Sequence, residues 1–228
     1  LIYFQQHMGF RKISMTAIER AALHVGNMNQ RNPVREWLKL LKWDGTDRLK
    51  TFMADAFGAK QNEYTAAVGR CWLISMVARA YVPGCQVDTL VVLEGPQGAY
   101  KSSACRTLVP EPWFSESHED PIHNRKDFLA QLKQYWSVEI PELHTIAGRG
   151  NGIEKIKGII SCRSDVYRVP YGRSTKEYPR QTVFVGTTNS DAWNPDSTGG
   201  RRFWPVTVGT ISIDYIKGAR DQLFAEAV

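Results

Sequence analysis

The segment LVVLEGPQGAYKSSACRTL (residues 90–108) joins a turn with two glycines to a lysine and a hydroxyl side chain. Backbone N–H groups at the start of a helix bind phosphate, a lysine there can reach the outer phosphates, and a neighbouring hydroxyl can bind Mg²⁺. The order of apolar strand, turn, Lys101, Ser102 and helix therefore predicts a phosphate-binding loop. An ordinary strand–turn–helix with a chance Lys-Ser pair is the alternative. The predicted nucleotide-binding residues are Gly95, Pro96, Gln97, Gly98, Ala99, Tyr100, Lys101, Ser102 and Ser103.

Tyr100 departs from the general pattern GxxxxGK[ST], which has a glycine directly before the lysine. That glycine lets the backbone approach the phosphates, so a tyrosine there requires that its Cβ and ring point away from the ligand. Gly98 keeps part of the backbone freedom. Hydrolysis is therefore a less secure expectation than nucleotide binding.

Two glutamates mark the end of the apolar run QYWSVEIPEL (residues 134–143). Nucleoside triphosphatases use one carboxylate at such a strand end to hold the water shell of Mg²⁺ and another to orient or deprotonate the attacking water. We assign Glu139, with Ser102, to the metal and Glu142 to the water. The reverse assignment and a pair of solvated loop carboxylates remain open.

Asn189 ends the run TVFVGTTN (residues 182–189), and Arg201 and Arg202 follow a glycine pair in STGGRRFWPV. An amide at the carboxyl edge of an open α/β sheet can hold the attacking water, although an Asn before Ser-Asp also begins ordinary turns. An arginine on a flexible turn can stabilise phosphoryl charge in a neighbouring subunit's site. A local salt bridge is the alternative. The predicted catalytic residues are Glu142, Asn189, Arg201 and Arg202.

Basic and aromatic residues alternate between positions 165 and 180, in DVYRVPYGRSTKEYPR. Two short extended stretches flank a Tyr-Gly-Arg-Ser turn, which predicts a β-hairpin. Such residues can contact phosphates and stack on bases of single-stranded DNA, while an exposed hairpin with a solvated basic face is the alternative. The predicted DNA contacts are Arg168, Tyr171, Arg173 and Lys176, with Arg180 as a further phosphate contact and Tyr167 and Tyr178 as further stacking residues.

These motifs need a sheet to position them, and the chain predicts one. Five apolar runs, at 88–95, 112–117, 134–140, 182–189 and 201–208, alternate with helical or polar stretches, which is typical of a mostly parallel sheet. The preceding part is helical, with Asn32 and Pro33 starting one helix, Gly58 ending a second and a third over 63–81. We expect a helical subdomain over 9–84 and an α/β core over 85–228.

Composition limits the class of protein. The chain has 228 residues, 43% hydrophobic and 11% aromatic, which excludes a disordered chain. Its 29 Lys and Arg against 23 Asp and Glu give a charge of +6, which favours an anionic partner without requiring one. No apolar run approaches the roughly 20 residues of a membrane span. Four cysteines without CxxC spacing indicate reduced thiols, hence a cytoplasmic protein without a structural zinc site.

The two ends suggest a piece of a longer protein. Residues 1–8, LIYFQQHM, are similar to the remnant of a cleavable affinity tag, and RDQLFAEAV stops within a helical pattern. The C-terminus is therefore expected to be truncated.

The motifs together resemble the virulence-associated E (VapE-type) family of phage and mobile-element proteins. The resemblance is carried by LEGPQGAYKSSACRTL, WSVEIPEL, RSDVYRVPYGRSTKEYPRQTVFVGTTN and STGGRRFWPV, and it extends from NPVREWLKLLKWDGTDRL to RDQLFAEAV. That family is similar to superfamily 3 helicases and phage primase-helicases. The resemblance implies an AAA+-like P-loop ATPase core with an N-terminal helical subdomain, a homo-oligomeric ring, ATP and Mg²⁺ as ligands, and a bacterial host cytoplasm.

Position by position, the resemblance assigns the same roles to the same residues. Lys101 and Ser102 match the family's phosphate and Mg²⁺ residues, Asn189 its polar sensor, and Glu139 with Glu142 its acidic pair. Arg201 and Arg202 match its arginine pair before the final strand, and the hairpin matches the one that grips single-stranded DNA in superfamily 3 rings. The leading hypothesis is an ATP-dependent DNA helicase or translocase module of a replication protein.

Two other functions share the phosphate loop. A nucleotide-binding switch or assembly module would bind ATP with little turnover, and Tyr100 is the residue that favours it. A small-molecule kinase would explain the loop but not the hairpin or the arginine turn.

Overall fold

The computed structural model of the chain describes residues 2–7, 9, 13–29, 31–116, 125–147, 150–167, 175–189 and 200–228. Its centre is a sheet of five parallel strands in the order β2-β3-β6-β1-β7. The strands are β1 (Leu90–Glu94), β2 (Phe114–Glu116), β3 (Ser137–Ile140), β6 (Val183–Thr188) and β7 (Phe203–Thr207). Each lies inside one of the five predicted runs, so the expected parallel α/β sheet is confirmed.

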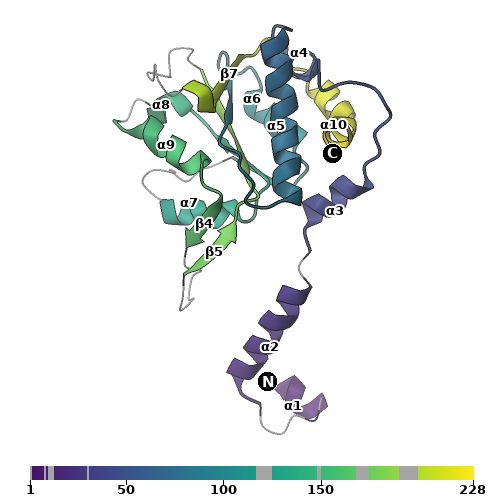
Figure 1. Cartoon of the computed structure of the whole chain (residues 1–228), viewed down its shortest axis with the longest axis vertical. Coiled ribbons are helices and arrows are strands. Elements are labelled where there is room, and N and C mark those ends of the chain that lie inside the picture. Colours follow the sequence, from purple (N-terminus) through teal and green to yellow (C-terminus); the bar gives the residue numbers. More distant parts are fainter. Residues whose placement is uncertain are drawn as a thin grey trace.

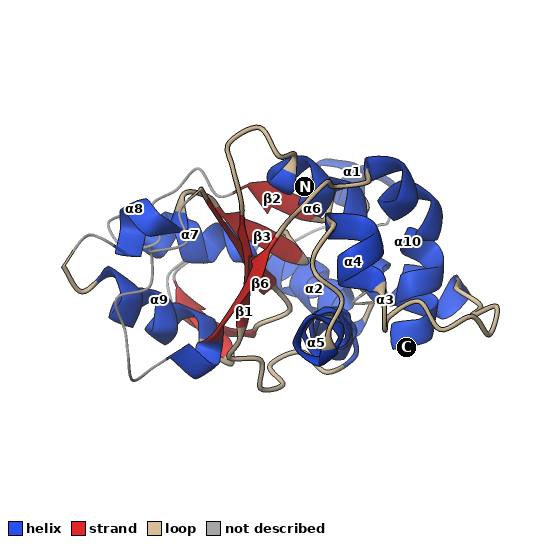
Figure 2. Cartoon of the chain, turned by 90° about the horizontal axis from the view of Figure 1, so that it is seen from above, coloured by secondary structure: helices blue, strands red, loops and turns tan. Residues whose placement is uncertain are grey.

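Helices cover both faces of this sheet (Figure 2). On one side lie α7 (Arg125–Leu132), α8 (Leu143–Ala147) and α9 (Gly152–Ile160); on the other lie α6 (Lys101–Leu108), α10 (Ile213–Ala227) and the helices that precede the sheet. Successive side chains of a strand point to opposite faces. In β1, Val91 and Leu93 accordingly pack on the side of α6 and α10, and Leu90 and Val92 pack on the side of α7, α8 and α9. Burial on both faces explains the continuous apolar runs LVVL in β1 and VFV in β6.

The helices before the sheet are α3 (Pro33–Leu40), α4 (Phe52–Phe57) and α5 (Glu63–Tyr81). Asn32 caps α3 as predicted, because its side chain accepts a hydrogen bond of 3.0 Å from the N–H of Arg35. Gly58 ends α4 in the left-handed conformation, with φ of 61°. Leu38, Phe52 and Trp72 from these helices belong to the same hydrophobic cluster as the β1 residues facing them. The helical front thus shares its core with the sheet.

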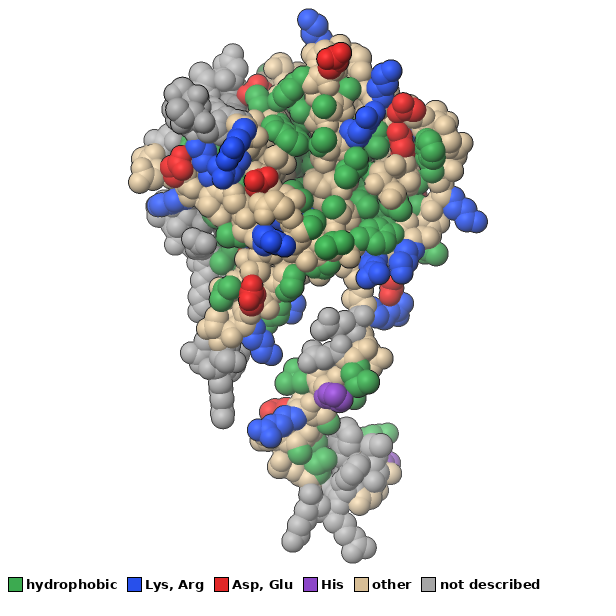
Figure 3. Space-filling view, viewed as in Figure 1, with side chains coloured by type: hydrophobic (Ala, Val, Ile, Leu, Met, Phe, Trp, Pro, Cys, Tyr) green, Lys and Arg blue, Asp and Glu red, His purple; other side chains and the backbone are tan. Residues whose placement is uncertain are grey.

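The first two helices lie apart from this body. These are α1 (Ile2–His7), inside the segment similar to a tag remnant, and α2 (Met15–Met28), which projects away from the rest of the chain (Figure 1). Ser14 caps α2 by accepting a hydrogen bond of 3.1 Å from the N–H of Ala17. Hydrophobic side chains are exposed along the projecting part (Figure 3), and α2 contributes to neither hydrophobic cluster of the described residues.

The predicted hairpin is formed at its base. Strands β4 (Ser164–Tyr167) and β5 (Lys176–Pro179) pair antiparallel, with Asp165 opposite Tyr178 and Tyr167 opposite Lys176. The turn, residues 168–174, lies outside the described residues.

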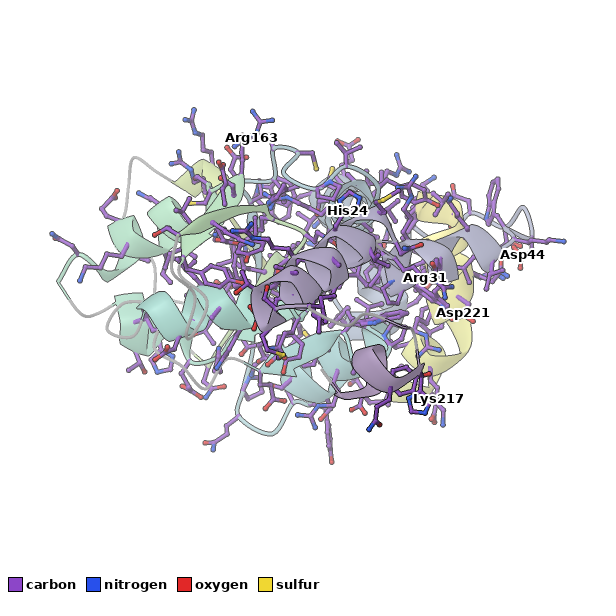
Figure 4. The ribbon with its side chains drawn as sticks, turned by 90° about the horizontal axis from the view of Figure 1, so that it is seen from below. His24, Arg31, Asp44, Arg163, Lys217 and Asp221 are labelled. Carbon is purple, nitrogen blue, oxygen red and sulfur yellow. The ribbon has the colours of Figure 1, made fainter. Side chains whose placement is uncertain are left out.

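Two arginines fasten this hairpin base to the segment before β1. Arg163 (labelled in Figure 4) donates from Nε to the carbonyl of Gly84 at 2.9 Å. The guanidinium of Arg79, on α5, donates to the carbonyls of Arg180 at 3.3 Å and Val87 at 3.1 Å. The position of the hairpin is therefore tied to both α5 and the chain that leads into β1.

Among the helices that the structure describes, none is long and apolar enough to cross a membrane.

Candidate functional site

Three of the predicted motifs follow three neighbouring strands at one edge of the sheet. The loop 95–100 follows β1, Asn189 follows β6, and β3 carries Glu139 near its end with Glu142 just beyond. The chain leaves β1 toward β2 and leaves β6 toward β7, which lie on opposite sides of this pair of strands. Open α/β sheets bind ligands at such a switch point, outside the carboxyl ends of their strands.

The loop itself uses left-handed backbone at Gly98, with φ of 79°, and at Tyr100, with φ of 61°. At Tyr100 this is the conformation that glycine adopts without steric cost. The Tyr100 side chain is 67% exposed, so the ring points into solvent, as the sequence required of a tyrosine here. Helix α6 starts at the next residue, and among the described residues no side-chain cap satisfies its first N–H groups at Tyr100. Those N–H groups can bind an anion.

Lys101 is buried, and its amine contacts the first residues of this loop. Its Nζ donates to the carbonyls of Gly95 at 2.7 Å and Pro96 at 2.8 Å, and to Oδ1 of Asn189 at 3.0 Å. Burial lowers the pKa of Lys101, while the charges of Glu142 and Glu139 act in the opposite direction. The amine thus joins the loop to the end of β6.

Glu139 is fully buried beside α6. Its Oε1 accepts hydrogen bonds from the hydroxyls of Ser102 at 2.7 Å and Thr187 at 2.6 Å. Its Oε2 is buried and has no hydrogen-bond partner among the residues that the structure describes. Burial raises the pKa of the Glu139 carboxyl, and the two hydroxyl donors offset part of that rise.

A carboxylate oxygen without a donor, next to a serine hydroxyl, fits a divalent cation. Hard cations such as Mg²⁺ take oxygen ligands and offset the cost of a buried negative charge. Ser102 and Glu139 are thus the side chains that could hold Mg²⁺, and the burial of Glu139 argues against the solvated-carboxylate alternative for this residue.

Glu142 lies at the surface, with both carboxylate oxygens held. Oε1 accepts from Nδ2 of Asn189 at 3.2 Å, and Oε2 lies 3.4 Å from Nε2 of His144. On its other side His144 contacts the hydroxyl of Thr188, at 3.2 Å from Nδ1. Asn189 therefore bridges Lys101 and Glu142, and the end of β6 contacts Glu142 directly through Asn189 and indirectly through His144.

The structure does not bring the two predicted arginines to this edge. Arg201 and Arg202 lie in a 3₁₀ turn, Gly200–Arg202, directly before Phe203, and Phe203 pairs with Leu90 at the amino end of β1. At about 3.3 Å per residue, the five residues of β1 separate them from the loop by roughly 13 Å or more. Within one chain these two residues therefore lie away from Lys101, and neither the role in a neighbouring subunit nor the local salt bridge is tested by this placement.

Three of the residues predicted to face DNA instead belong to the base of the hairpin. Arg180 is 2% exposed and pairs with Asp165 through two of its nitrogens, so its prediction as a phosphate contact is wrong. Tyr167 is buried and stacks on Tyr178 with ring centroids 4.9 Å apart, and Lys133 lies over the Tyr178 ring at 4.5 Å. These rings are used in internal packing and are not free for bases.

Four predicted DNA contacts remain. Lys176 is exposed at the start of β5. Arg168, Tyr171 and Arg173 lie outside the described residues.

The sequence reasoning missed three residues of the site: Thr187, Thr188 and His144. The available signal for the threonines was the change from apolar to hydroxyl side chains at the end of VFVGTT. Two consecutive threonines point to opposite faces of the sheet, and one accordingly reaches Glu139 and the other His144. For His144 the sequence offered only its position two residues after Glu142.

Fold and site together define a class of protein. It has a parallel α/β sheet, a lysine at the start of the helix that follows one strand, and a buried carboxylate near the end of another strand, both at the carboxyl edge of the sheet. The sequence matches the model of the virulence-associated protein E-like domain over residues 38–228. The chain belongs to this family, as its motifs indicated. No curated protein matches it.

Solved structures with a similar fold include two apo structures of the NrS-1 C-terminal region. The A form of that region has a TM-score of 0.56 and 14% identity, over 83% of this chain and 47% of that chain. The other has a TM-score of 0.53 and 15% identity, over 82% of this chain and 47% of that chain. The chain thus spans about half the length of these structures, and at this identity the likeness concerns the fold.

Proposed function

We propose that this chain is an ATP-dependent DNA helicase or translocase module of a phage or mobile-element replication protein. The observation that carries the proposal is the set of contacts from Lys101 to Asn189 and from Ser102 to Glu139 at one edge of a parallel sheet. Among the described residues, these contacts combine a cationic amine, a helix start without a side-chain cap and a buried carboxylate with one oxygen that has no hydrogen-bond partner. Nucleoside triphosphates with Mg²⁺ have the charges that these groups complement.

In the proposed reaction, water attacks the γ-phosphate in line with the leaving oxygen. Bound Mg²⁺ would neutralise charge on the phosphate oxygens. Lys101 binds and orients the outer phosphates, and the N–H groups at the start of α6 bind the inner ones. Glu142 accepts the proton of the attacking water, and Asn189 holds that water in place. Arg201 or Arg202 of a neighbouring subunit stabilises the transferring group, since neither lies at its own chain's site.

The fold and the family support the same proposal. The chain resembles superfamily 3 helicases in the order of its motifs, and such proteins act as rings. The hairpin leaves the body beside α7, on the side of the sheet opposite α5 and α10 (Figure 1). In the proposal Arg168, Tyr171, Arg173 and Lys176 grip single-stranded DNA through phosphate contacts and base stacking.

ATP hydrolysis by the whole chain, with and without single-stranded DNA, tests this function. We expect Mg²⁺-dependent hydrolysis that rises with DNA and falls about 10²- to 10³-fold in Lys101→Ala. Lys217→Ala removes an exposed lysine of α10, outside the site and the hairpin, and is the matched control. Lys101→Ala with unchanged turnover would remove the phosphate-loop assignment. Nucleotide binding without turnover, in an assembly shown to be oligomeric, would support the switch module instead.

A further inference from the structure

We propose that His144 is a positioning residue for Glu142, fixing the carboxylate that activates water in the ATP site. This inference rests on the proposed function and adds to it a residue that no motif marks. Nε2 of His144 lies 3.4 Å from Oε2 of Glu142, and Nδ1 lies 3.2 Å from Oγ1 of Thr188. The imidazole thus stands between the carboxylate and the end of β6.

The backbone of Glu142 shows that its surroundings define its position. Its φ is 50°, in the left-handed region that residues with a Cβ rarely adopt. A residue stays in such a conformation where neighbouring contacts determine it, and these cases gather at functional sites. Glu142 is more than half exposed, so packing alone does not hold it.

The two oxygens of Glu142 have separate partners with separate roles. Oε1 accepts from Asn189, which also accepts from Lys101. Oε2 faces His144, whose other nitrogen is fixed by a hydroxyl of the sheet. Because Asn189 is shared with Lys101 and, in the proposed reaction, with the attacking water, His144 is the partner that orients the carboxylate alone.

In a neutral His144 ring, one tautomer satisfies the contacts with both Thr188 and Glu142. In the tautomer with its proton on Nε2, the ring directs that proton at Oε2 of Glu142, and Nδ1 accepts from the Thr188 hydroxyl. A base oriented by a third group is a recurring arrangement in enzymes that activate water or hydroxyl nucleophiles. The 3.4 Å separation is long for a hydrogen bond, as such contacts often are without substrate.

Two substitutions distinguish the roles of the two ring nitrogens of His144. Glutamine keeps a donor near the place of Nε2, while asparagine keeps a polar atom near Nδ1 only. We expect His144→Asn to lower kcat about 10-fold or more, within the roughly 10²- to 10⁴-fold that a general base contributes. We expect His144→Gln to keep most of kcat, and the KM for ATP and the affinity for a fluorescent ATP analogue to change less than about twofold in both. His24→Asn, on exposed α2 (Figure 4), is the matched control.

A second background distinguishes positioning from folding. In Glu142→Gln, whose turnover is already low, His144→Asn should lower kcat no further, because residues that act as a unit are not additive. An equal further loss in both backgrounds, or a lower unfolding midpoint with loss of ATP-analogue binding, would show a structural role and overturn the inference. If the wild type hydrolyses ATP and His144→Asn hydrolyses it at the same rate, this inference alone is overturned. No turnover by the wild-type assembly would remove it together with the proposed function.

Discussion

The ATP site proposed here and the hairpin base both bury charged side chains, but they balance the charge differently. At the hairpin base, Arg180 and Asp165 are both buried and meet in an ion pair through several nitrogen–oxygen contacts. At the sheet edge, Glu139 is equally buried, but one of its oxygens has no partner among the described residues. A buried charge whose partner is inside the protein supports the fold, whereas one without a complete set of partners indicates a ligand. In the proposed function, the buried carboxylate therefore supports the fold at the hairpin base and holds a ligand at the sheet edge.

Breaking the hairpin pair should have the largest effect on stability. Arg180→Ala leaves Asp165 buried and uncompensated, so the free energy of unfolding should fall by about 3 to 5 kcal/mol in chemical denaturation. Arg220→Ala is the matched control, because its pair with Asp221 is partly exposed and worth about 1 kcal/mol or less. Equal losses in the two variants would remove the distinction between the regions.

Glu139→Gln should change the free energy of unfolding in the opposite direction. The amide removes a buried charge without a full set of partners, so without Mg²⁺ stability should rise, by up to about 1 to 3 kcal/mol, while Mg²⁺-dependent turnover is lost. Asp165→Asn, the same change at the hairpin base, should destabilise. A stability loss in Glu139→Gln similar to that of Asp165→Asn would contradict the assignment of Glu139 as a ligand.

The pH dependence of Glu139 follows from the raised pKa of its carboxyl. A raised folded-state pKa stabilises the fold below the unfolded-state pKa, and this contribution is lost as the pH rises through the folded-state pKa. With Mg²⁺ chelated, the wild type should therefore lose stability as the pH rises above about 4.5, whereas Glu139→Gln has no carboxyl at this position to titrate. The difference between their unfolding midpoints should increase with pH in this range. A difference that stays constant between acidic and neutral pH would show that the carboxyl titrates as in the unfolded chain.

Removing charge from the outer hairpin should leave stability nearly unchanged and weaken DNA binding. Arg173→Ala with Lys176→Ala should reduce the affinity for single-stranded DNA and lower the slope of log K against log salt by about 0.7 for each DNA phosphate that the two side chains neutralise. Lys217→Ala with Arg220→Ala on α10 (Lys217 is labelled in Figure 4) is the control with the same change in net charge. An unchanged salt slope would show that the hairpin does not contact the DNA backbone.

The smallest effect is expected at Tyr100. Its backbone already has the left-handed conformation of a glycine and its ring lies in solvent, so Tyr100→Gly should change turnover by no more than about twofold. Steady-state ATP hydrolysis measures this. A sharp rise in turnover would show that Tyr100 restrains hydrolysis and would favour the switch module.

Local signals predicted the fold where they were strong. Asn32 with Pro33, Gly58 and the five apolar runs gave element positions that the structure confirms, because caps, glycine conformations and burial on both faces act over a few residues. The same local patterns could not show that Arg180 and Tyr167 face inward. In a hairpin, which face is buried depends on the elements that pack against it, here α7, α5 and the segment before β1.

The sequence by itself determined which residues can do chemistry and on which strand each would lie. Only the tertiary structure decided their neighbours, because contacts between Lys101 and Asn189, or Ser102 and Glu139, join residues 88 and 37 positions apart through the strand order. It also placed Arg201 and Arg202 at the opposite edge, since a parallel strand separates the residues before it from those after it by its full length. His144 gained its place next to Glu142 and Thr188 for the same reason: two strand ends that are distant in sequence meet at one edge of the sheet.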